Sequence, residues 1–535
     1  MRVPALLLSV VASIPLAGWL FAAEPALHPR IDELIAARAD GPLIPQSSDA
    51  EFLRRIYLDL AGRVPSAEEA RPFLASGEVN KRALLIDKLL QSPDHVRRIS
   101  QVFHVMLMER LGDHEDWQKF LRESFQANKP WDQMCREILD PNADSETTRG
   151  SALWYTKRLE HYGQNPVDVP GLVRDIGRHF MGIDVQCAQC HDHLFVDDYK
   201  QDFYHGLLGF VGQAQIRTDV KFPAVAVAPL TKKLDFMSVF VQKPLAVGPK
   251  LPGGSEVEIP TFSKGDEFEV PPDKAKKFPG VPKFNTLKVL AEQLPRAENK
   301  LFTHNIANRL WWVVMGRGLV HPLDLSHSGN PASHPELLDL LASELAAHQF
   351  DMRYLLREIV LSQAYQRSSL AGDDALAAAP TDRYRVALEK PLSSEQMLAS
   401  VRQALGDGQP LKIDLADKTW IEWQAKFDKA LANPAREPEV EHAPTVKAAL
   451  FLMHDANILA WVRPDGENLA ARLGKETDAG KLAGELYLSV LSRQPTDEET
   501  KLTAEYLASH TDRRERAVSN LIWSLLASNE FCTNH

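Results

Sequence analysis

The residues best suited to chemistry lie in the run CAQCH, from Cys187 to His191. The two thiols are one helical turn apart, so both can form thioether bonds with the vinyl groups of a single haem. The adjacent imidazole can then bind the iron. The spacing therefore predicts haem c, with Cys187 and Cys190 as the attachment points and His191 as the proximal ligand.

A second axial ligand is not obvious from the sequence. His193 is too close to His191 to reach the opposite face of the haem. More distant candidates, which the sequence does not distinguish, are His179, Met181, His205, Met106 and Met108. Iron with five ligands fits the sequence equally well.

The same residues also fit a site for zinc or another transition metal. Two thiolates and two imidazoles, from Cys187, Cys190, His191 and His193, suit tetrahedral zinc. Four carboxylates lie nearby, on Asp192, Asp197, Asp198 and Asp202. However, adjacent ligands at 190 and 191 would strain one tetrahedron. A third interpretation is a redox-active or structural thiol pair.

Residues 1–23 have the features of a secretory signal peptide. Arg2 precedes a long apolar stretch that ends in the small residues Ala22 and Ala23, and Pro15 would interrupt a membrane-spanning helix. We expect cleavage and export to the periplasm or cell surface. No later apolar run approaches about 18 residues, so we expect no transmembrane segment after cleavage. Export agrees with haem c, which is attached outside the cytoplasm.

Composition limits the possible functions. The formal net charge is −11, and no stripe of basic and aromatic residues is present, which argues against nucleic acid as a partner. The chain has only four cysteines, fewer than a disulfide-dependent exported protein usually carries, although a bridge between Cys135 and Cys532 remains open. No phosphate-binding loop, dinucleotide fingerprint or hydrolase motif occurs, so no reaction is assigned.

The hydrophobic pattern predicts a mainly α protein with two multi-helix domains separated by a small β-rich insert. Helical periodicity extends over 24–212 and returns over 284–535. Between them, at 213–283, prolines and glycines accompany short alternating runs. Capping boxes at helix starts are predicted where Glu69 follows Ser66 and where Glu336 follows Ser333.

Two distant segments resemble each other. The run IYLDLAGRVPSAEEA at 56–70 and the run LYLSVLSRQPTDEET at 486–500 share Tyr, Leu, Arg, Pro and paired glutamates in register. We interpret both as a helix, a proline-containing stop and a capping box, in preference to a duplication. In either case the motif is architectural.

The stretch FMGIDVQCAQCHDHLFVDDYKQDFYHGLLGF resembles the planctomycete cytochrome-like domain of unknown function, and RRIYLDLAGRVPSAEE resembles its opening segment. NRLWWVVMGRGLV, SHPELLDLLASEL, LLREIVLSQAYQRSS and WSLLASNEF are similar to its usual C-terminal companion domain. The resemblance implies a large exported protein that binds haem and is connected with the breakdown of complex polysaccharides. We expect an electron-transfer or accessory redox role, with redox proteins or polysaccharide-processing assemblies as partners. The alternatives are an exported non-haem metal-dependent enzyme or accessory protein of polysaccharide breakdown, and a helical scaffold in which the CxxCH run is structural. Leu194 stands where the family has proline after HDH, and Val196 where an acid is frequent.

Overall fold

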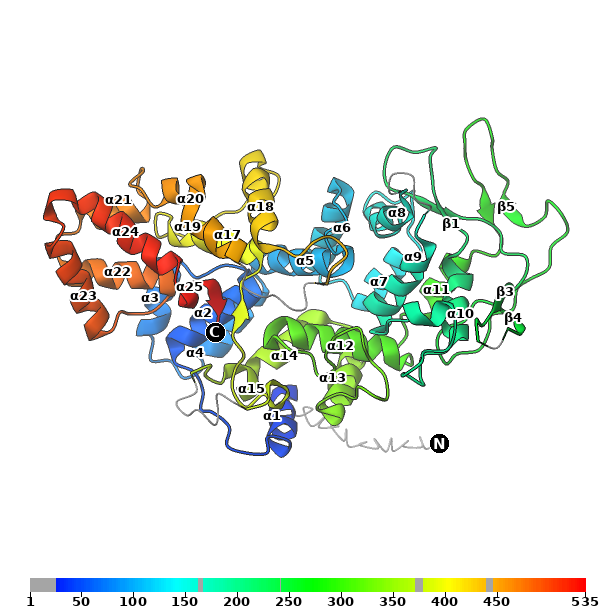
Figure 1. The fold of residues 1–535 in the computed structure, drawn as a ribbon, viewed down its shortest axis with the longest axis horizontal. Coiled ribbons are helices and arrows are strands. Elements are labelled where there is room, and N and C mark those ends of the chain that lie inside the picture. The colour runs from blue at the N-terminus through cyan, green and yellow to red at the C-terminus, as the bar shows by residue number, and fades with distance from the viewer. Residues whose placement is uncertain (1–25, 162–166, 241, 371–378, 439–445) are drawn as a thin grey trace, which may run out of the picture.

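The computed structural model describes residues 26–161, 167–240, 242–370, 379–438 and 446–535. Within these ranges the protein is mainly α, as predicted, and its strands form only two-stranded sheets (Figure 1). The predicted signal peptide, residues 1–23, lies outside the described residues. None of the described helices combines the length and apolar character needed to cross a membrane.

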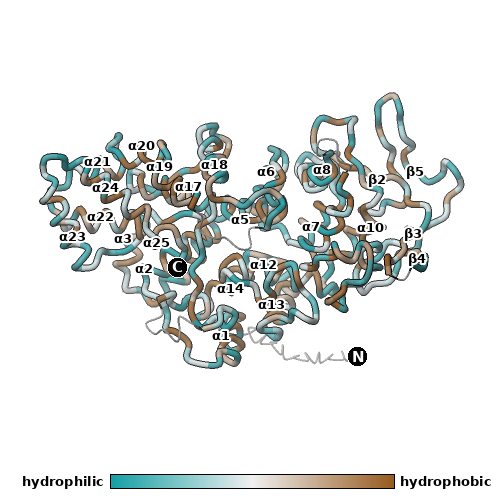
Figure 2. Tube along the Cα trace, viewed as in Figure 1, coloured by the Kyte–Doolittle hydropathy of each residue, from teal (hydrophilic) through white to brown (hydrophobic). Residues whose placement is uncertain are grey.

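The helices before the insert are amphipathic, and α6 (Glu115–Gln126) shows why they form. Trp117, Phe120, Leu121 and Phe125 lie on one buried face, while charged side chains occupy the other. Figure 2 shows the same alternation of hydrophobic and hydrophilic segments along most helices. The remaining helices of this part are α1 (Leu27–Ala37), α2 (Asp49–Ala61), α3 (Ala67–Ala75), α4 (Lys81–Leu90), α5 (Pro93–Met108), α7 (Trp131–Leu139), α8 (Leu153–Leu159), α9 (Val169–Ile176) and α10 (Gln201–Val211).

The insert consists of three separate antiparallel hairpins, which agrees with the predicted β-rich segment. Proline cannot donate to a strand ladder, so it is confined to strand starts and edges; Pro244 accordingly opens β4. The hairpins pair β1 (Ala214–Ile216) with β2 (Val225–Val227), β3 (Leu234–Met237) with β4 (Pro244–Val247), and β5 (Phe268–Val270) with β6 (Val281–Pro282).

Helices return after the insert. Those described here are α11 (Thr286–Gln293), α12 (Lys300–Met315), α13 (Pro335–Ala347), α14 (Met352–Leu361), α15 (Gln363–Gln366), α17 (Ser394–Ala404), α18 (Lys418–Leu431), α19 (Val446–His454), α20 (Ala456–Trp461), α21 (Leu469–Lys475), α22 (Ala479–Leu491), α23 (Asp497–Ala508), α24 (Arg514–Leu526) and α25 (Asn529–Cys532). The short strands β7 (Lys390–Pro391) and β8 (Thr533–Asn534) pair antiparallel, so the segment just before α17 contacts the segment just after α25.

Two hydrophobic cores hold these helices, and their division does not follow the change in composition at 284. The first core takes in α1 to α14 together, so α11 to α14 pack with the helices that precede the insert. Helix α12 is central because Ile306 and Leu310, on one face, and Trp311, on the adjoining face, are all fully buried. The second core is formed mainly by α17 to α25. Along this part of the chain, Tyr384 still belongs to the first core, and Leu392 is the first residue of the second.

The two ends of the chain meet in the second core. Leu58 of α2 and Val64 belong to it, and α3 packs against α22 at the same end of the molecule (Figure 1). The buried guanidinium of Arg54 donates to the backbone carbonyls of Val490 and Phe531, at 3.3 and 2.7 Å. A charged side chain from the N-terminal part therefore satisfies carbonyl groups near the C-terminus.

The two similar sequence segments make the same contacts. Arg63 binds Glu69 through both terminal nitrogens, at 2.8 and 2.9 Å, and Arg493 binds Glu499 in the same way at 2.8 Å twice. Each glutamate also completes a capping box at the start of its helix, α3 or α23. The motif is architectural in both places.

Candidate functional site

The CAQCH run lies in an exposed loop between α9 and α10, and two buried residues fix it in place. Val185 and Ala188 are fully buried beneath the loop, while Cys187 and Cys190 are exposed. The loop leaves the preceding helical turn at Gly182, whose φ of +67° favours glycine. The inward residues therefore turn both thiols toward solvent.

His191 has a defined hydrogen-bonding state. Its Nδ1 lies 2.6 Å from the carbonyl oxygen of Asp192. Because a carbonyl oxygen only accepts, Nδ1 carries a proton, and in the neutral imidazole Nε2 then keeps its lone pair. The imidazole is thereby prepared to bind a metal through Nε2, with its other nitrogen held by a backbone acceptor.

His193 uses its Nδ1 in the opposite way, as a hydrogen-bond acceptor. Its Nδ1 accepts hydrogen bonds from the backbone N–H groups of Phe195 and Val196, at 3.2 and 3.0 Å. A neutral imidazole that accepts at Nδ1 carries its proton on Nε2, so Nε2 is a donor and not a ligand. His193 thus stabilises the loop that follows His191.

The four residues of the alternative metal site do not bring their ligand atoms together. Among the described residues, His, Cys, Asp or Glu ligand atoms of three or more residues converge within 4.8 Å only at Glu109, Asp175 and His179. The structure therefore holds Cys187, Cys190 and His191 in one loop, but it does not arrange them with His193 as a tetrahedral set.

The loop is tied to α10 and to a distant segment. The first N–H of α10, that of Gln201, donates to Asp192 at 2.8 Å, and Nε2 of His205 donates to the carbonyl oxygen of Gln189 at 3.1 Å. The hydroxyl of Tyr199 donates to the carbonyl oxygen of Ser326 at 3.0 Å. These bonds position the CAQCH run on the first core.

The residues considered as a second axial ligand are mostly enclosed. Met108, Met181 and His179 are buried in the first core, and Met106 lines a cavity of about 500 Å³ between the two cores. His205 lies next to the loop, but its ring stacks on Phe236 at 4.1 Å.

The other two cysteines do not form the disulfide that the sequence left open. Cys135 is buried in the first core, Cys532 packs against the second core, and both thiols are free.

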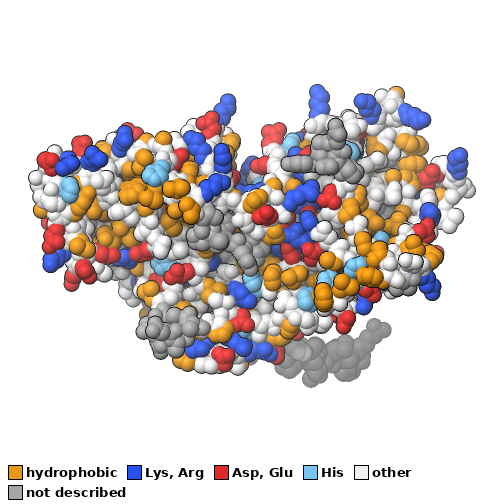
Figure 3. Space-filling view, viewed as in Figure 1, with side chains coloured by type: hydrophobic (Ala, Val, Ile, Leu, Met, Phe, Trp, Pro, Cys, Tyr) orange, Lys and Arg blue, Asp and Glu red, His pale blue; other side chains and the backbone are white. Residues whose placement is uncertain are grey.

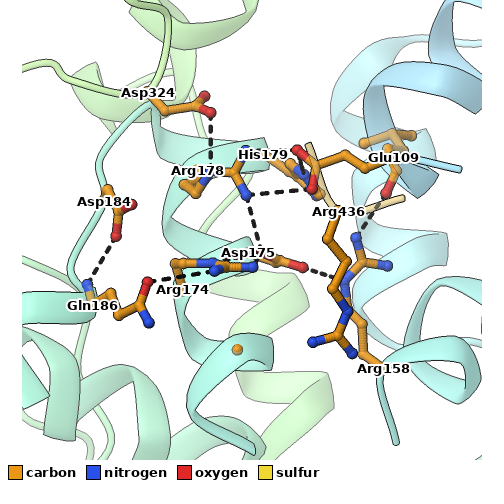
Figure 4. Close-up of polar contacts among 12 residues, drawn as sticks. Glu109, Arg158, Arg174, Asp175, Arg178, His179, Asp184, Gln186, Asp324 and Arg436 are labelled. Carbon is orange, nitrogen blue, oxygen red and sulfur yellow. Dashed lines mark hydrogen bonds and ion pairs between the residues drawn. The ribbon is translucent and has the colours of Figure 1, made fainter. Parts of the chain in front are cut away.

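A buried ionic network lies beneath the loop (Figure 4). Arg178 donates to Glu109 at 2.6 Å, and Arg158 donates to Asp175 at 2.7 Å. Burial would raise the pKa of Glu109, but hydrogen bonds and charges of His179 and Arg178 lower it to about 2. Figure 3 shows basic and acidic side chains in the recess beside α6, in the same region.

This network was not predicted from the sequence, because Glu109 is more than sixty positions from its partners. Its carboxylates are ionised, but each is already bound by a guanidinium, so a divalent cation would compete with arginine charges. Burial lowers the pKa of His179, and the hydrogen bond and negative charge of Glu109 oppose that shift. We interpret the network as the structural support of the turn that leads to the loop.

Two family models match the chain. Residues 30–215 match PSCyt2, described as a protein of unknown function (DUF1549), and residues 287–411 match PSD1, described as a protein of unknown function (DUF1553). The chain carries these two domains in this order. No curated protein and no solved structure matches it.

The PSCyt2 region contains the CAQCH loop and most of the buried network, whereas Asp324, which accepts from Arg178 at 3.0 Å, belongs to the PSD1 region. The PSD1 region contributes α12, whose Asn305 donates to the carbonyl oxygen of His179 at 2.8 Å. The hairpin β3–β4 belongs to neither matched region, yet Val239, just after β3, donates to the carbonyl oxygen of Cys190 at 3.1 Å. The insert therefore completes the surroundings of a loop that the PSCyt2 domain supplies.

Proposed function

We propose that this protein is an exported c-type haem protein with an electron-transfer or accessory redox role. The observation that carries the proposal is the arrangement of the CAQCH loop: two exposed free thiols beside an imidazole whose Nδ1 donates to the carbonyl oxygen of Asp192, which leaves Nε2 of the neutral ring available as a ligand. Cys187 and Cys190 attach the haem, and His191 is the proximal ligand.

Attachment requires only the reduced thiols and the two vinyl groups. Each S–H adds across one C=C bond, so one S–C bond and one C–H bond form and no group leaves. When bound, the haem supplies one-electron redox chemistry. The chain's own contribution is to hold both sulfur atoms at the surface and to keep Nδ1 of His191 bound to a carbonyl, which makes Nε2 a stronger ligand.

Apolar side chains around the loop support the same proposal. Leu194 and Phe195 follow His193 and are both exposed, Phe195 by 90%. The ring of Phe240 lies 4.8 Å from that of His191 and is also exposed. Such a patch is a suitable surface for a flat, largely apolar ring.

The setting of the protein follows from the sequence. The signal peptide at 1–23 would deliver the chain to the periplasm or cell surface, where haem c is attached. An attachment loop at the surface places one edge of the haem within reach of redox partner proteins, including those of polysaccharide-processing assemblies. A zinc or other transition-metal site is less well supported, since His193 presents a protonated Nε2.

The direct test is expression in a bacterial host competent for cytochrome c maturation, followed by haem staining of a denaturing gel. We expect staining of the wild-type chain and its loss in the C187S/C190S double variant. The matched control is C135S/C532S, which removes the other two thiols and should stain like the wild type. An unstained wild-type band, with stoichiometric zinc found by metal analysis, would contradict the proposal.

A further inference from the structure

The cavity between the two cores is lined by segments from every main part of the folded chain. Its volume is about 500 Å³, a size that small-molecule sites commonly have. Helix α5 of the PSCyt2 region lines it together with α12 and residues 389–396 of the PSD1 region, and Asn534 adds a residue from the end of the chain. Figure 1 shows α5 and α12 at the centre of the molecule. The cavity therefore exists only when these parts are packed together.

One face of each of the two helices lines the cavity. The lining residues are three and four positions apart, as one helix face requires. On α5 they are Arg98, Gln101, Val102, Val105, Met106 and Glu109, and on α12 they are Arg309, Trp312, Val313 and Gly316. The seven positions from Arg309 to Gly316 correspond to about 10 Å of helix. The space is therefore an elongated slot that runs along both helices.

The middle of the slot is apolar and accessible. Val102, Val105 and Met106 of α5 and Trp312 and Val313 of α12 line it, and all five side chains are only half-buried. A half-buried tryptophan offers a large apolar ring surface to a ligand. This strip suits a ring-shaped ligand that has an apolar C–H face.

The charged groups at the two ends of the slot are neutralised within the protein. At one end Arg178 donates to Glu109 at 2.6 Å and to Asp324 at 3.0 Å. At the other end Nζ of Lys390 donates to Asp59 at 2.6 Å. A ligand with a net charge would have to compete with these ion pairs, and breaking a buried pair is costly. The lining therefore favours a neutral ligand.

The remaining polar groups of the slot include both donors and acceptors. Within the described part of the chain, the amide of Gln101 and the carboxylate of Glu389 have no hydrogen-bond partner. The ammonium group of Lys390 has three N–H bonds, of which Asp59 and the carbonyl oxygen of Val314 accept two. A hydroxyl group can accept from Lys390 or Gln101 and donate to Glu389. A ligand that carries several hydroxyl groups matches this set.

We propose that the slot binds a neutral sugar of about disaccharide size, with a C–H face on Trp312 and hydroxyl groups at Gln101, Glu389 and Lys390. The inference goes beyond the haem function proposed above and does not depend on it, because no residue of the CAQCH loop lines the slot. A hydrocarbon of the same shape would leave the buried polar groups unpaired, which costs binding free energy. An anionic or cationic sugar would bring a charge for which the lining has no free partner.

The test is isothermal titration calorimetry of the full-length protein with cellobiose, maltose, lactose and xylobiose. We expect at least one of them to bind with a Kd below about 1 mM. The charged comparison uses the disaccharide of glucosamine, which is cationic, and cellobiouronic acid, which is anionic. Both should bind at least about tenfold more weakly than the best neutral disaccharide, a difference of about 1.4 kcal/mol.

Three variants locate the binding site. Val105→Trp fills the slot without touching an ion pair and should weaken binding at least tenfold. Gln101→Ala removes no hydrogen bond within the described part of the protein and should weaken binding several-fold. Val79→Trp adds the same ring at a fully exposed position and should bind like the wild type.

Circular dichroism shows whether each variant is folded. No binding of any of the four neutral disaccharides, or tighter binding of the charged ones, overturns the inference. Unchanged binding in both Val105→Trp and Gln101→Ala also overturns it, because the sugar would then bind elsewhere. None of these results affects the haem proposal, which the stained gel tests separately.

Discussion

Nδ1 of His191 lies 2.6 Å from the carbonyl oxygen of Asp192, whereas Nδ1 of His193 accepts two backbone N–H groups. The two histidines are two positions apart and have opposite tautomers. Their roles should therefore differ, and each can be tested separately.

We predict that His191→Gln removes imidazole ligation from the haem completely, and that His193→Gln leaves it intact. Both variants keep Cys187 and Cys190, so both should retain covalent haem. The measurement is the ferric electron paramagnetic resonance spectrum. A changed ligand field in His193→Gln, with no change in His191→Gln, would contradict the assignment of the proximal ligand.

Two equivalent ion pairs should contribute unequally to stability. The side chain of Arg63 is 2% exposed and binds both Glu69 and Asp94. Arg63→Met should leave Glu69 without its guanidinium partner, while Asp94 keeps Arg97, at a cost of about 3 kcal/mol. The side chain of Arg493 is 26% exposed, so Arg493→Met should cost about 1 kcal/mol after solvent screening. Denaturant unfolding monitored by circular dichroism measures both, and equal losses would refute the argument from burial.

The buried network should make the protein sensitive to acid. The folded-state pKa of Glu109, about 2, is below the unfolded value of about 4.3. Its contribution to the free energy of unfolding, roughly 3 kcal/mol, is therefore present above about pH 4 and is lost as the pH falls toward 2. The lowered pKa of His179 acts in the same direction, because this group gains a proton on unfolding below about pH 6.5.

Unfolding free energies measured between pH 7 and pH 3 check this expectation. Glu109→Gln should be less stable than the wild type at pH 7 and should show a shallower loss of stability in acid. An unchanged slope in this variant would show that the acid sensitivity arises elsewhere.

The turn into the CAQCH loop should depend on glycine. Gly182 has a φ of +67°, and an added Cβ would lie 3.0 Å from Oδ1 of Asn305. Gly182→Ala should therefore cost about 1–2 kcal/mol for the left-handed backbone alone. Gly77→Ala is the control, since no atom lies within 4 Å of its Cβ, and should change stability by less than about 0.5 kcal/mol. Thermal unfolding of the two variants gives the comparison.

Local patterns in the sequence predicted much of the fold. The spacing of Ser66 and Glu69 predicted a capping box that the structure confirms, because both partners belong to one helical turn. The same pattern at Ser333 and Glu336 was misleading: α13 begins after His334, with no side-chain cap, and Pro335 is its first residue. The spacing of hydrophobic residues also predicted the predominance of helices and the β-rich insert.

Interactions between distant segments could not be predicted from the sequence. Glu109 joins Asp175 and His179 only through packing of α5 against the turn after α9, and no short motif records that contact. The packing of α11 to α14 with the first core likewise depends on which buried faces are complementary.

The bonds from Arg54 to the carbonyl groups of Val490 and Phe531 have a consequence for biogenesis. When α2 emerges from the ribosome, the acceptors of this guanidinium are still more than four hundred residues from being synthesised. The second core therefore closes last, and a nascent or truncated chain that ends with the PSD1 match at residue 411 lacks α18 to α25, which leaves the second-core faces of α2 and α17 incompletely covered. Such a chain would present an apolar surface for chaperones and proteases to recognise.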